Sequence, residues 1–98
     1  MKYNIIVLCE ANRDLHEIRE YLANMDENPP KKFRKSYEEF VEQVSNMPFI
    51  FPQYEFNPRY RKAAVEFGYL IFYCVDKRKK EVVIYRVLNN KQNIENLL

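Results

Sequence analysis

The chain has 98 residues, of which 47% are hydrophobic and 31% charged, and this composition is typical of a globular chain with one core. No apolar run approaches the roughly 20 residues that a membrane-spanning helix needs, and a lone glycine, Gly68, argues against a Gly-rich phosphate-binding loop. We therefore expect a single domain over residues 1–98, located in the cytoplasm, with no membrane association, no cofactor and no metal.

The charge is distributed unevenly along the chain, although the net charge is only +2. Residues 1–49 hold seven Lys and Arg against nine Asp and Glu, whereas residues 50–98 hold nine against five. A basic C-terminal half is typical of proteins that bind nucleic acid or an acidic protein surface, and it also fits a plain solvated surface. The charge pattern alone leaves these alternatives open.

The N-terminal residues predict a strand followed by an amphipathic helix. The run Tyr3–Cys9 is short and rich in β-branched residues, as strands are. In the next stretch, EANRDLHEIREYLANM, apolar residues recur at spacings of three and four, which marks one face of a helix. These residues are Ala11, Leu15, Ile18, Leu22 and Met25. Asp14, Glu17 and Glu20 fall off this stripe and are predicted to face water, and His16 is predicted to be an exposed helix histidine.

The two cysteines, Cys9 and Cys74, both lie in apolar, strand-like runs. This placement predicts reduced thiols in the core. With His16 as the chain's one histidine, the cysteines lack the ligand number and spacing of a zinc site.

A second helix is predicted between two proline signals. The segment Asn28–Pro30 ends the first helix and can start the next one, since proline is tolerated in a first helical turn. Pro48 ends the second helix. Its apolar residues again recur at three and four: Phe33, Tyr37, Phe40, Val41, Val44 and Met47. The two helices form a hairpin whose apolar stripe needs a sheet to cover.

The C-terminal half predicts a loop and three strands. Residues 49–58 contain two prolines and four aromatic residues, which indicates a loop packed against the core. The strands are predicted at 59–67, 69–76 and 81–88, with Gly68 in the first turn and the basic residues 77–80 in the second. The middle strand is apolar on both faces and is therefore expected to be central.

The element order β-α-α-β-β-β predicts an α+β fold, with the helical hairpin packed on one face of a small, mainly antiparallel sheet. The first strand is expected to join this sheet at a position that the sequence does not give. Residues 89–93, NNKQN, are too polar for the core. They are predicted to form either an exposed recognition surface or a plain turn with a helix cap, after which Ile94, Leu97 and Leu98 fold back.

Several segments resemble the RelE/ParE superfamily, the toxins of bacterial type II toxin–antitoxin modules. EANRDLHEIREYL resembles the family's first helix with its Asp-Leu pair. RYRKAAVEFGYLIFYCVD resembles the segment in which a basic pair precedes a strand, a Gly and a Tyr-x-Ile-Phe-Tyr run. VVIYRVLNNKQNIENLL resembles the closing strand with its Arg-Val-Leu and the polar segment that follows. The order and spacing of these segments carry the resemblance.

The resemblance implies a growth-inhibiting toxin that a cognate antitoxin protein holds inactive, either as a homodimer or in a toxin–antitoxin hetero-oligomer. It leaves two chemistries open. RelE-like members cut mRNA on the ribosome, whereas ParE-like members, known from plasmid stabilisation and addiction modules, inhibit DNA gyrase. A non-toxic α+β binding module is a further alternative outside the family.

Compared with the family's nuclease pattern, this chain lacks several functional groups. Arg61 matches the first basic position, but Ala63 and Leu70 stand where further cations are expected, and Leu97 stands where a late Tyr is expected. Asn89 replaces a frequent His, and Lys91 replaces a frequent Arg. An aliphatic side chain can neither stabilise a phosphorane nor protonate a leaving oxygen. The resemblance therefore favours the ParE branch, with catalytic residues unknown and target-binding candidates at Arg61, Lys62, Arg86, Asn89, Asn90 and Lys91.

Overall fold

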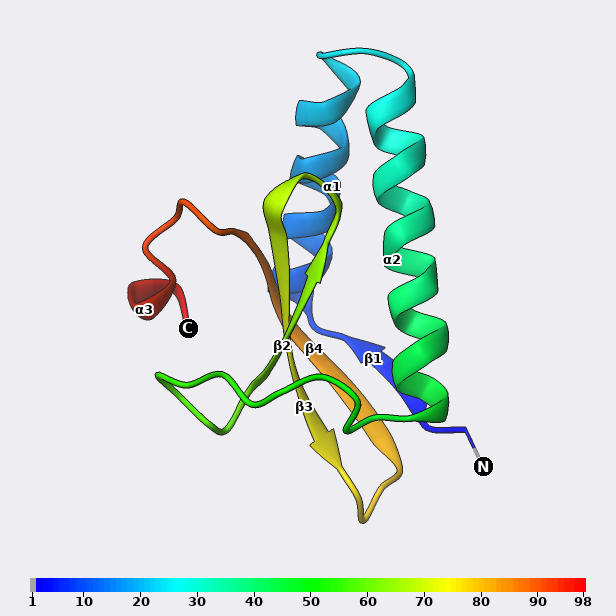
Figure 1. The fold of residues 1–98 in the computed structure, drawn as a ribbon, viewed down its shortest axis with the longest axis vertical. Helices are drawn as coiled ribbons and strands as arrows, with labels where there is room; N and C mark the ends of the chain where they lie inside the picture. Colours follow the sequence, from blue (N-terminus) through cyan, green and yellow to red (C-terminus); the bar gives the residue numbers. More distant parts are fainter. Residues whose placement is uncertain (1) are drawn as a thin grey trace.

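The computed structural model of the chain describes residues 2–98, and Figure 1 shows its elements. In chain order these are β1 (Asn4–Val7), α1 (Cys9–Ala23), α2 (Asn28–Asn46), β2 (Arg61–Val65), a 3-10 turn η1 (Glu66–Gly68), β3 (Tyr69–Asp76), β4 (Glu81–Asn89) and α3 (Ile94–Leu97). The predicted order β-α-α-β-β-β and the α+β class are confirmed. Within these residues, no helix has both the length and the apolar composition needed to cross a membrane.

The four strands form one sheet in the order β1-β4-β3-β2. The hairpins β2–β3 and β3–β4 are antiparallel, whereas β1 pairs with β4 in parallel. A parallel pair needs a long connection, and here the whole helical hairpin and two strands separate β1 from β4 along the chain. The predicted central position of Tyr69–Asp76 is confirmed, since β3 lies between β2 and β4.

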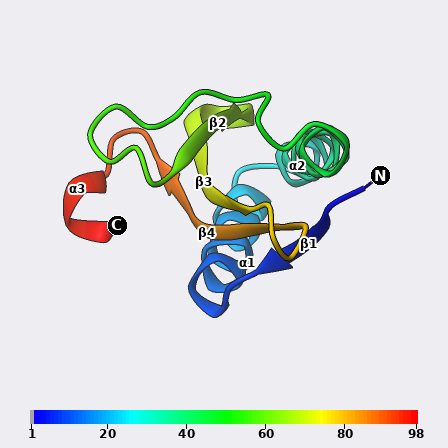
Figure 2. The same cartoon turned by 90° about the horizontal axis from the view of Figure 1, so that it is seen from below.

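One face of the sheet is covered by α1 and α2 (Figure 2). The buried residues between these two helices and the sheet form what we call the helix-side cluster. It comprises Ala11, Leu15, Ile18, Leu22, Phe33, Phe40, Val44, Ala63, Tyr69, Ile71, Tyr73, Val82, Ile84 and Val87. Both helices contribute residues spaced three, four or seven apart, as their sequence periodicity predicted. The placement of the helical hairpin on one face of the sheet is therefore confirmed.

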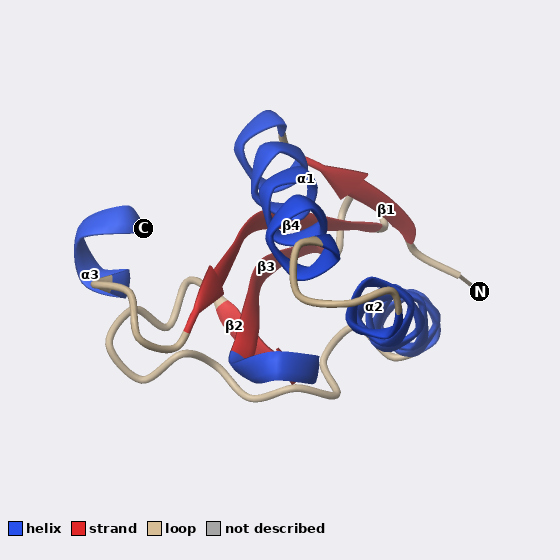
Figure 3. Cartoon of the chain, turned by 90° about the horizontal axis from the view of Figure 1, so that it is seen from above, coloured by secondary structure: helices blue, strands red, loops and turns tan. Residues whose placement is uncertain are grey.

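The opposite face carries a smaller group, the outer-side cluster, made of Tyr54, Tyr60, Phe72 and Leu88 with Leu70, Cys74, Tyr85, Ile94 and Leu98 packed against it. The loop between α2 and β2 supplies Tyr54 and Tyr60, and the C-terminal segment supplies Ile94 and Leu98. Figure 3 shows α3 on the side of the sheet away from α1 and α2. The expected packing of the loop and the folding back of Ile94 and Leu98 are confirmed. Leu97, which was also predicted to fold back, is exposed instead.

Three predictions about buried side chains are wrong. Met25 and Met47 are 62% and 56% exposed, because each lies past the last residue of its helix, where the helical periodicity no longer holds. Cys9 is exposed, because β1 already ends at Val7 and Cys9 opens α1. Cys74 is half-buried, and burial raises the pKa of its thiol. His16 is exposed on α1 beside Glu20, as predicted.

Tyr73 lies at the centre of the helix-side cluster. Its side chain is fully buried, its ring makes an edge contact with Phe40, and its hydroxyl donates a hydrogen bond to the Pro48 carbonyl at 2.9 Å. Burial raises the pKa of Tyr73 to about 12. The neutral phenol thus ties the end of α2 to the central strand, whereas a phenolate there would lie in an apolar environment.

This environment predicts an alkaline loss of stability. The folded state holds the Tyr73 proton more tightly than the unfolded chain, so its contribution is complete below about pH 10 and is lost as pH rises towards about 12. In urea unfolding, Tyr73 should account for a fall of about 1 kcal/mol in unfolding free energy between about pH 9 and about pH 11.

The variant Tyr73→Phe tests this attribution. It should lower the unfolding free energy at about pH 9 by about 1 kcal/mol, because the Pro48 carbonyl loses its donor. Between about pH 9 and about pH 11, the unfolding free energy of this variant should then fall less than that of the wild type. Tyr21→Phe, at a tyrosine that is 61% exposed, serves as the control and should leave the wild-type pH profile unchanged. An equal fall of the unfolding free energy with pH in all three proteins would contradict the prediction.

Candidate functional site

The candidate site begins at an irregularity in β4. Phe72 pairs with Arg86, whereas the next residue of β3, Tyr73, pairs with Ile84. Tyr85 is therefore the extra residue of a β-bulge, which shifts the alternation of side chains by one position. Before the bulge Ile84 faces the helices, and after it Val87 does. Because β1 pairs with β4 only as far as Ile84, the rest of β4 lacks a strand partner on that side.

The carboxylate of Asp14 takes the place of the missing strand. Its Oδ2 accepts the backbone N–H of Val87 at 3.0 Å and the Nε–H of Arg86 at 2.8 Å, while its Oδ1 accepts an Nη2–H of Arg86 at 3.0 Å. The Asp14 side chain is only 9% exposed. The prediction that Asp14 faces water is therefore wrong, because helix periodicity cannot reveal a polar partner in a strand 72 residues away.

Arg86 also contacts the C-terminal segment. Its Nη1 donates to the Leu97 carbonyl at 3.1 Å and lies 3.5 Å from Oε2 of Glu10. Hydrogen bonding to Asp14 is the main cause of the raised pKa of Arg86. One guanidinium thus connects α1, β4 and the end of α3, and each of its three nitrogens has an acceptor within the chain.

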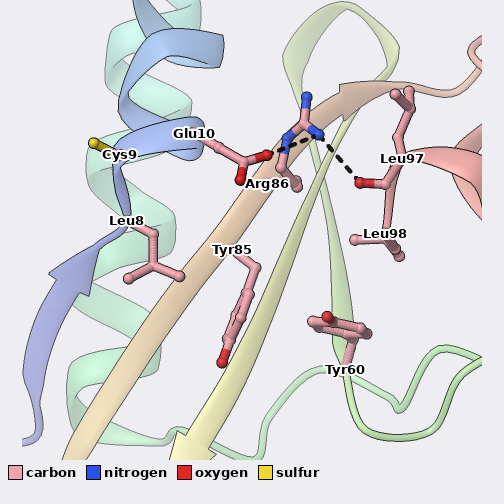
Figure 4. Close-up of a pocket in the computed structure, with 8 residues that line it drawn as sticks. All are labelled: Leu8, Cys9, Glu10, Tyr60, Tyr85, Arg86, Leu97 and Leu98. Atoms are coloured by element: carbon pink, nitrogen blue, oxygen red, sulfur yellow. Dashed lines mark hydrogen bonds and ion pairs between the residues drawn. The ribbon is translucent and has the colours of Figure 1, made fainter.

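A groove of about 470 Å³ lies beside this guanidinium, and we call it the Arg86 groove (Figure 4). Its walls come from the start of α1, from β4, from the residue before β2 and from the C-terminus. They consist of Leu8, Cys9, Glu10, Tyr60, Tyr85, Arg86, Leu97 and Leu98. Glu10 is the one carboxylate in this lining, and it faces Arg86. The chain's histidine lies elsewhere, on the surface of α1, so the groove offers apolar and phenolic contacts and no imidazole.

The structure separates Arg61 from Lys62. Arg61 lies on the helix side of β2, where its Nη1 donates to the Phe51 carbonyl at 2.7 Å and its guanidinium lies over the Phe49 ring. Lys62 pairs with Phe72 across the sheet and places its ammonium 5.6 Å from the Tyr54 ring centroid, on the outer side. Neighbouring residues of a strand point to opposite faces, and the two cations therefore do not form one patch.

Asn89, Asn90 and Lys91 begin the segment 89–93, which we call the polar turn. The Asn89 side chain accepts the N–H of Lys91 at 2.9 Å, and the N–H of Asn90 donates to the Gly68 carbonyl at 3.0 Å. The segment is therefore a turn with internal hydrogen bonds, as one of the two alternatives predicted. The Asn90 and Lys91 side chains are exposed, so both are accessible to a partner, and the Asn90 side chain lies beside Gly68 of the β2–β3 turn.

The positions compared with the nuclease pattern have different surroundings. Ala63 is 1% exposed in the helix-side cluster, so a side chain there cannot reach the outer side of the sheet. Leu70 packs on the outer side, and the backbone of Leu97 binds Arg86. Leu70 is thus the substitution that changes the outer surface, whereas Ala63 is a packing residue.

Sequence reasoning missed Arg59, which precedes β2. Its guanidinium lies 5.6 Å from the ring centroid of Tyr60 and 5.4 Å from that of Tyr85, and it donates to the Tyr85 hydroxyl at 3.2 Å. Arg59 also lines a basic hollow of about 590 Å³, formed with Phe49, Cys74, Val75, Asp76, Lys77, Arg78, Val83 and Tyr85. The available signal was the segment PRYRK, in which one aromatic residue, Tyr60, lies among three cations.

The hollow has a positive balance of charge. It contains three cationic side chains and one carboxylate, Asp76, whose Oδ1 accepts the backbone N–H groups of Arg78 and Lys79 at 3.0 Å each. Lys77 and Arg78 of the β3–β4 turn therefore form part of a concave surface. Such a surface favours acidic segments of a partner.

Solved structures from toxin–antitoxin systems share this architecture. The chain is similar to a protein in the toxin–antitoxin complex RelBE2 from Mycobacterium tuberculosis, with a TM-score of 0.66 and 23% identity over 94% of this chain and 95% of that chain. It is also similar to a chain of the chromosomal ParDE system from P. aeruginosa, with a TM-score of 0.63 and 20% identity over 90% and 96%. The comparison with a double mutant of the E. coli toxin RelE in the free state gives a TM-score of 0.65 and 18% identity over 100% of both chains.

Comparison of the sequence with models of protein families identifies the family. A family model described as the ParE toxin of type II toxin–antitoxin system, parDE, matches residues 5–94. The chain therefore belongs to the ParE toxin family of type II toxin–antitoxin systems. No curated protein matches it.

Two of the sequence segments that carried the resemblance meet in space. The Asp-Leu of the first helix contains Asp14, and the Arg-Val-Leu of the last strand contains Arg86 and Val87. All three hydrogen bonds of the Asp14 carboxylate run between these segments. The motifs thus describe one structural contact that fixes the end of β4.

We predict that Asp14→Ala lowers the unfolding free energy by about 3 kcal/mol, because it leaves the Val87 N–H and a largely buried guanidinium without their acceptor. A double-mutant cycle with Arg86→Ala should give a coupling free energy of about 1–2 kcal/mol. Urea unfolding of the wild type, both single variants and the double variant measures these values.

The matched control is the surface ion pair Lys2–Glu42, whose side chains are 63% and 65% exposed. Glu42→Ala should cost much less unfolding free energy than Asp14→Ala, because solvent screens both charges of this exposed pair. Additive effects of Asp14→Ala and Arg86→Ala, or a cost no larger than that of the control, would contradict the structural role assigned to Asp14.

Proposed function

We propose that this toxin inhibits bacterial growth by acting on DNA gyrase, and that its contact surface includes the polar turn. The observation that carries the proposal is the engagement of Arg86. All three guanidinium nitrogens of this late-strand arginine have acceptors in Asp14, Leu97 and Glu10. A phosphate would have to compete with these acceptors, and binding a partner protein needs no such rearrangement.

The outer side of the sheet supports the same proposal. Cleavage of RNA through its 2′-hydroxyl needs cations at the phosphate and a proton donor for the leaving oxygen. Leu70 occupies an outer position where the nuclease pattern has a cation, and the side chain of Leu97 is aliphatic. These residues suit contact with a protein surface better than phosphoryl chemistry.

A second candidate is ribosome-dependent cleavage of mRNA. It is favoured by the cations that do lie on the outer side, Arg59 between Tyr60 and Tyr85 and Lys62 over Tyr54. Aromatic and cationic side chains of this kind can stack and neutralise single-stranded RNA. The similarity to the E. coli toxin RelE is compatible with this alternative.

A paired assay of the purified chain separates the two functions. We expect inhibition of gyrase supercoiling and no codon-positioned cuts in mRNA on translating ribosomes, as read by primer extension. Cuts in mRNA with unaffected gyrase would overturn the proposal and favour the second candidate.

For the contact surface, we predict that Lys91→Gln weakens gyrase inhibition roughly tenfold, the effect of about 1.4 kcal/mol of lost binding free energy. Lys31→Gln, at an exposed lysine on α2, is the matched control and should act like the wild type. Equal inhibition by both variants would remove Lys91 from the contact surface. Melting temperatures should stay equal, because neither ammonium forms an ion pair among the described residues.

We also propose a cognate antitoxin as partner, since the structural relatives include toxin–antitoxin complexes. Its acidic residues would match the basic hollow around Arg59, Lys77 and Arg78. Electrostatic complementarity of this kind mainly raises the association rate. Co-expression with the adjacent small reading frame should give a complex that survives purification at moderate salt.

The basic hollow can be tested within that complex. Arg78→Gln together with Lys77→Gln should slow association roughly tenfold at low salt and much less at high salt, because salt screens exposed charges. Stopped-flow mixing of toxin and antitoxin gives the rate. If the variant and the wild type associate at equal rates, the antitoxin's acidic residues do not bind at the basic hollow.

A further inference from the structure

The turn between β2 and β3 holds a bulky side chain on a left-handed backbone. Phe67 has φ 64° and ψ 25°, and Gly68 follows with φ 76°. Glycine adopts this conformation freely, and Asn tolerates it, but a large aromatic residue rarely does. Non-glycine residues of this kind cluster at functional sites, where the surrounding structure holds them in place.

The surrounding structure does hold this turn from two sides. The N–H of Glu66 donates to Ser36 Oγ on α2 at 3.2 Å, and the Gly68 carbonyl accepts the N–H of Asn90 at 3.0 Å. The pair Val65–Tyr69 closes the turn at its base. Phe67 is thus fixed before any partner arrives, which lowers the entropic cost of binding.

Core packing does not explain why a phenylalanine occupies this position. Phe67 is 40% exposed and belongs to neither the helix-side nor the outer-side cluster. Its polar, exposed neighbours include Glu66 in the chain and Asn90 across the turn. An exposed aromatic side chain surrounded by polar groups is the arrangement found at the energetic centre of many protein interfaces.

We propose that Phe67 anchors this chain to a folded protein partner by inserting into an apolar pocket whose rim offers groups that bind the Asn90 amide and the Lys91 ammonium. The partner is the growth-arrest target, so the inference rests on the proposed function but not on the target's being gyrase. The charge around the turn favours protein over nucleic acid. The residue next to Phe67 is the acidic Glu66, whereas nucleic-acid surfaces require a marked positive excess.

The test compares stability and growth arrest in Phe67→Asn and Phe67→Gly. Both residues accept the left-handed backbone, so the melting temperature should stay within about 4 °C of the wild type or rise. Growth arrest on induction, compared at equal levels of soluble protein, should require roughly tenfold more toxin, in keeping with the loss of an interface anchor. Phe67→Tyr keeps the ring and should arrest growth like the wild type.

The matched control is Phe56→Asn, at a phenylalanine that is 67% exposed in the loop before β2 and whose φ is not positive. It should keep full growth arrest. Full arrest by both Phe67 variants, or equal losses for Phe56 and Phe67, would overturn the proposal. A wild type that does not arrest growth would overturn it together with the proposed function.

Two further readouts separate the remaining outcomes. If the wild type arrests growth and depends on Phe67 but leaves gyrase supercoiling unaffected, the gyrase assignment fails and the anchor stands. Fluorescence anisotropy with a labelled single-stranded oligonucleotide should detect no binding that depends on Phe67. Binding that Phe67→Asn abolishes and Phe67→Tyr restores would reassign the ring to base stacking and overturn the protein partner.

Discussion

The fold depends on one carboxylate that completes a sheet edge. Past Ile84, β4 loses its parallel neighbour β1, and a bulge at Tyr85 turns the next side chains to new faces. Asp14 stabilises this irregular end by accepting the N–H of Val87 and two N–H groups of Arg86. Without that acceptor, a buried backbone donor and a cation would have to be solvated at a site that packing has closed to water.

The two faces of the sheet have different surroundings. On the helix side, alternate residues of β3 and β4 interlock with α1 and α2 in a dense apolar core, and Ala63 belongs to it. On the outer side, aromatic rings lie beside the cations of Arg59 and Lys62. Neighbouring residues in β2 therefore serve different purposes, and a motif read as a continuous string of letters mixes structural and surface positions.

Periodicity predicted the helices, the hairpins and the helix-covered face, because each depends on local spacing of apolar residues. The parallel pairing of β1 with β4 could not be predicted in this way, since it is set by how the helical hairpin returns across the sheet. Asp14 was misplaced for the same reason: its partners lie at the other end of the chain. The polar turn could be recognised from its composition, but the role of Arg59 depends on Tyr85, which the fold brings beside it.

The left-handed Phe67 and the end of β4 lie at one end of the sheet, opposite the β3–β4 turn that holds the left-handed Lys80. Tyr69 pairs with Asn89, so the β2–β3 turn and the end of β4 are neighbours, and the Asn90 N–H binds the Gly68 carbonyl directly. The left-handed Phe67 and the bulge held by Asp14 are thus connected through a few hydrogen bonds, while the core lies mostly towards the helices. Because strained or irregular backbone persists only where neighbours fix it, the stability of the helix-side core is what allows this end to present exposed side chains in a fixed geometry.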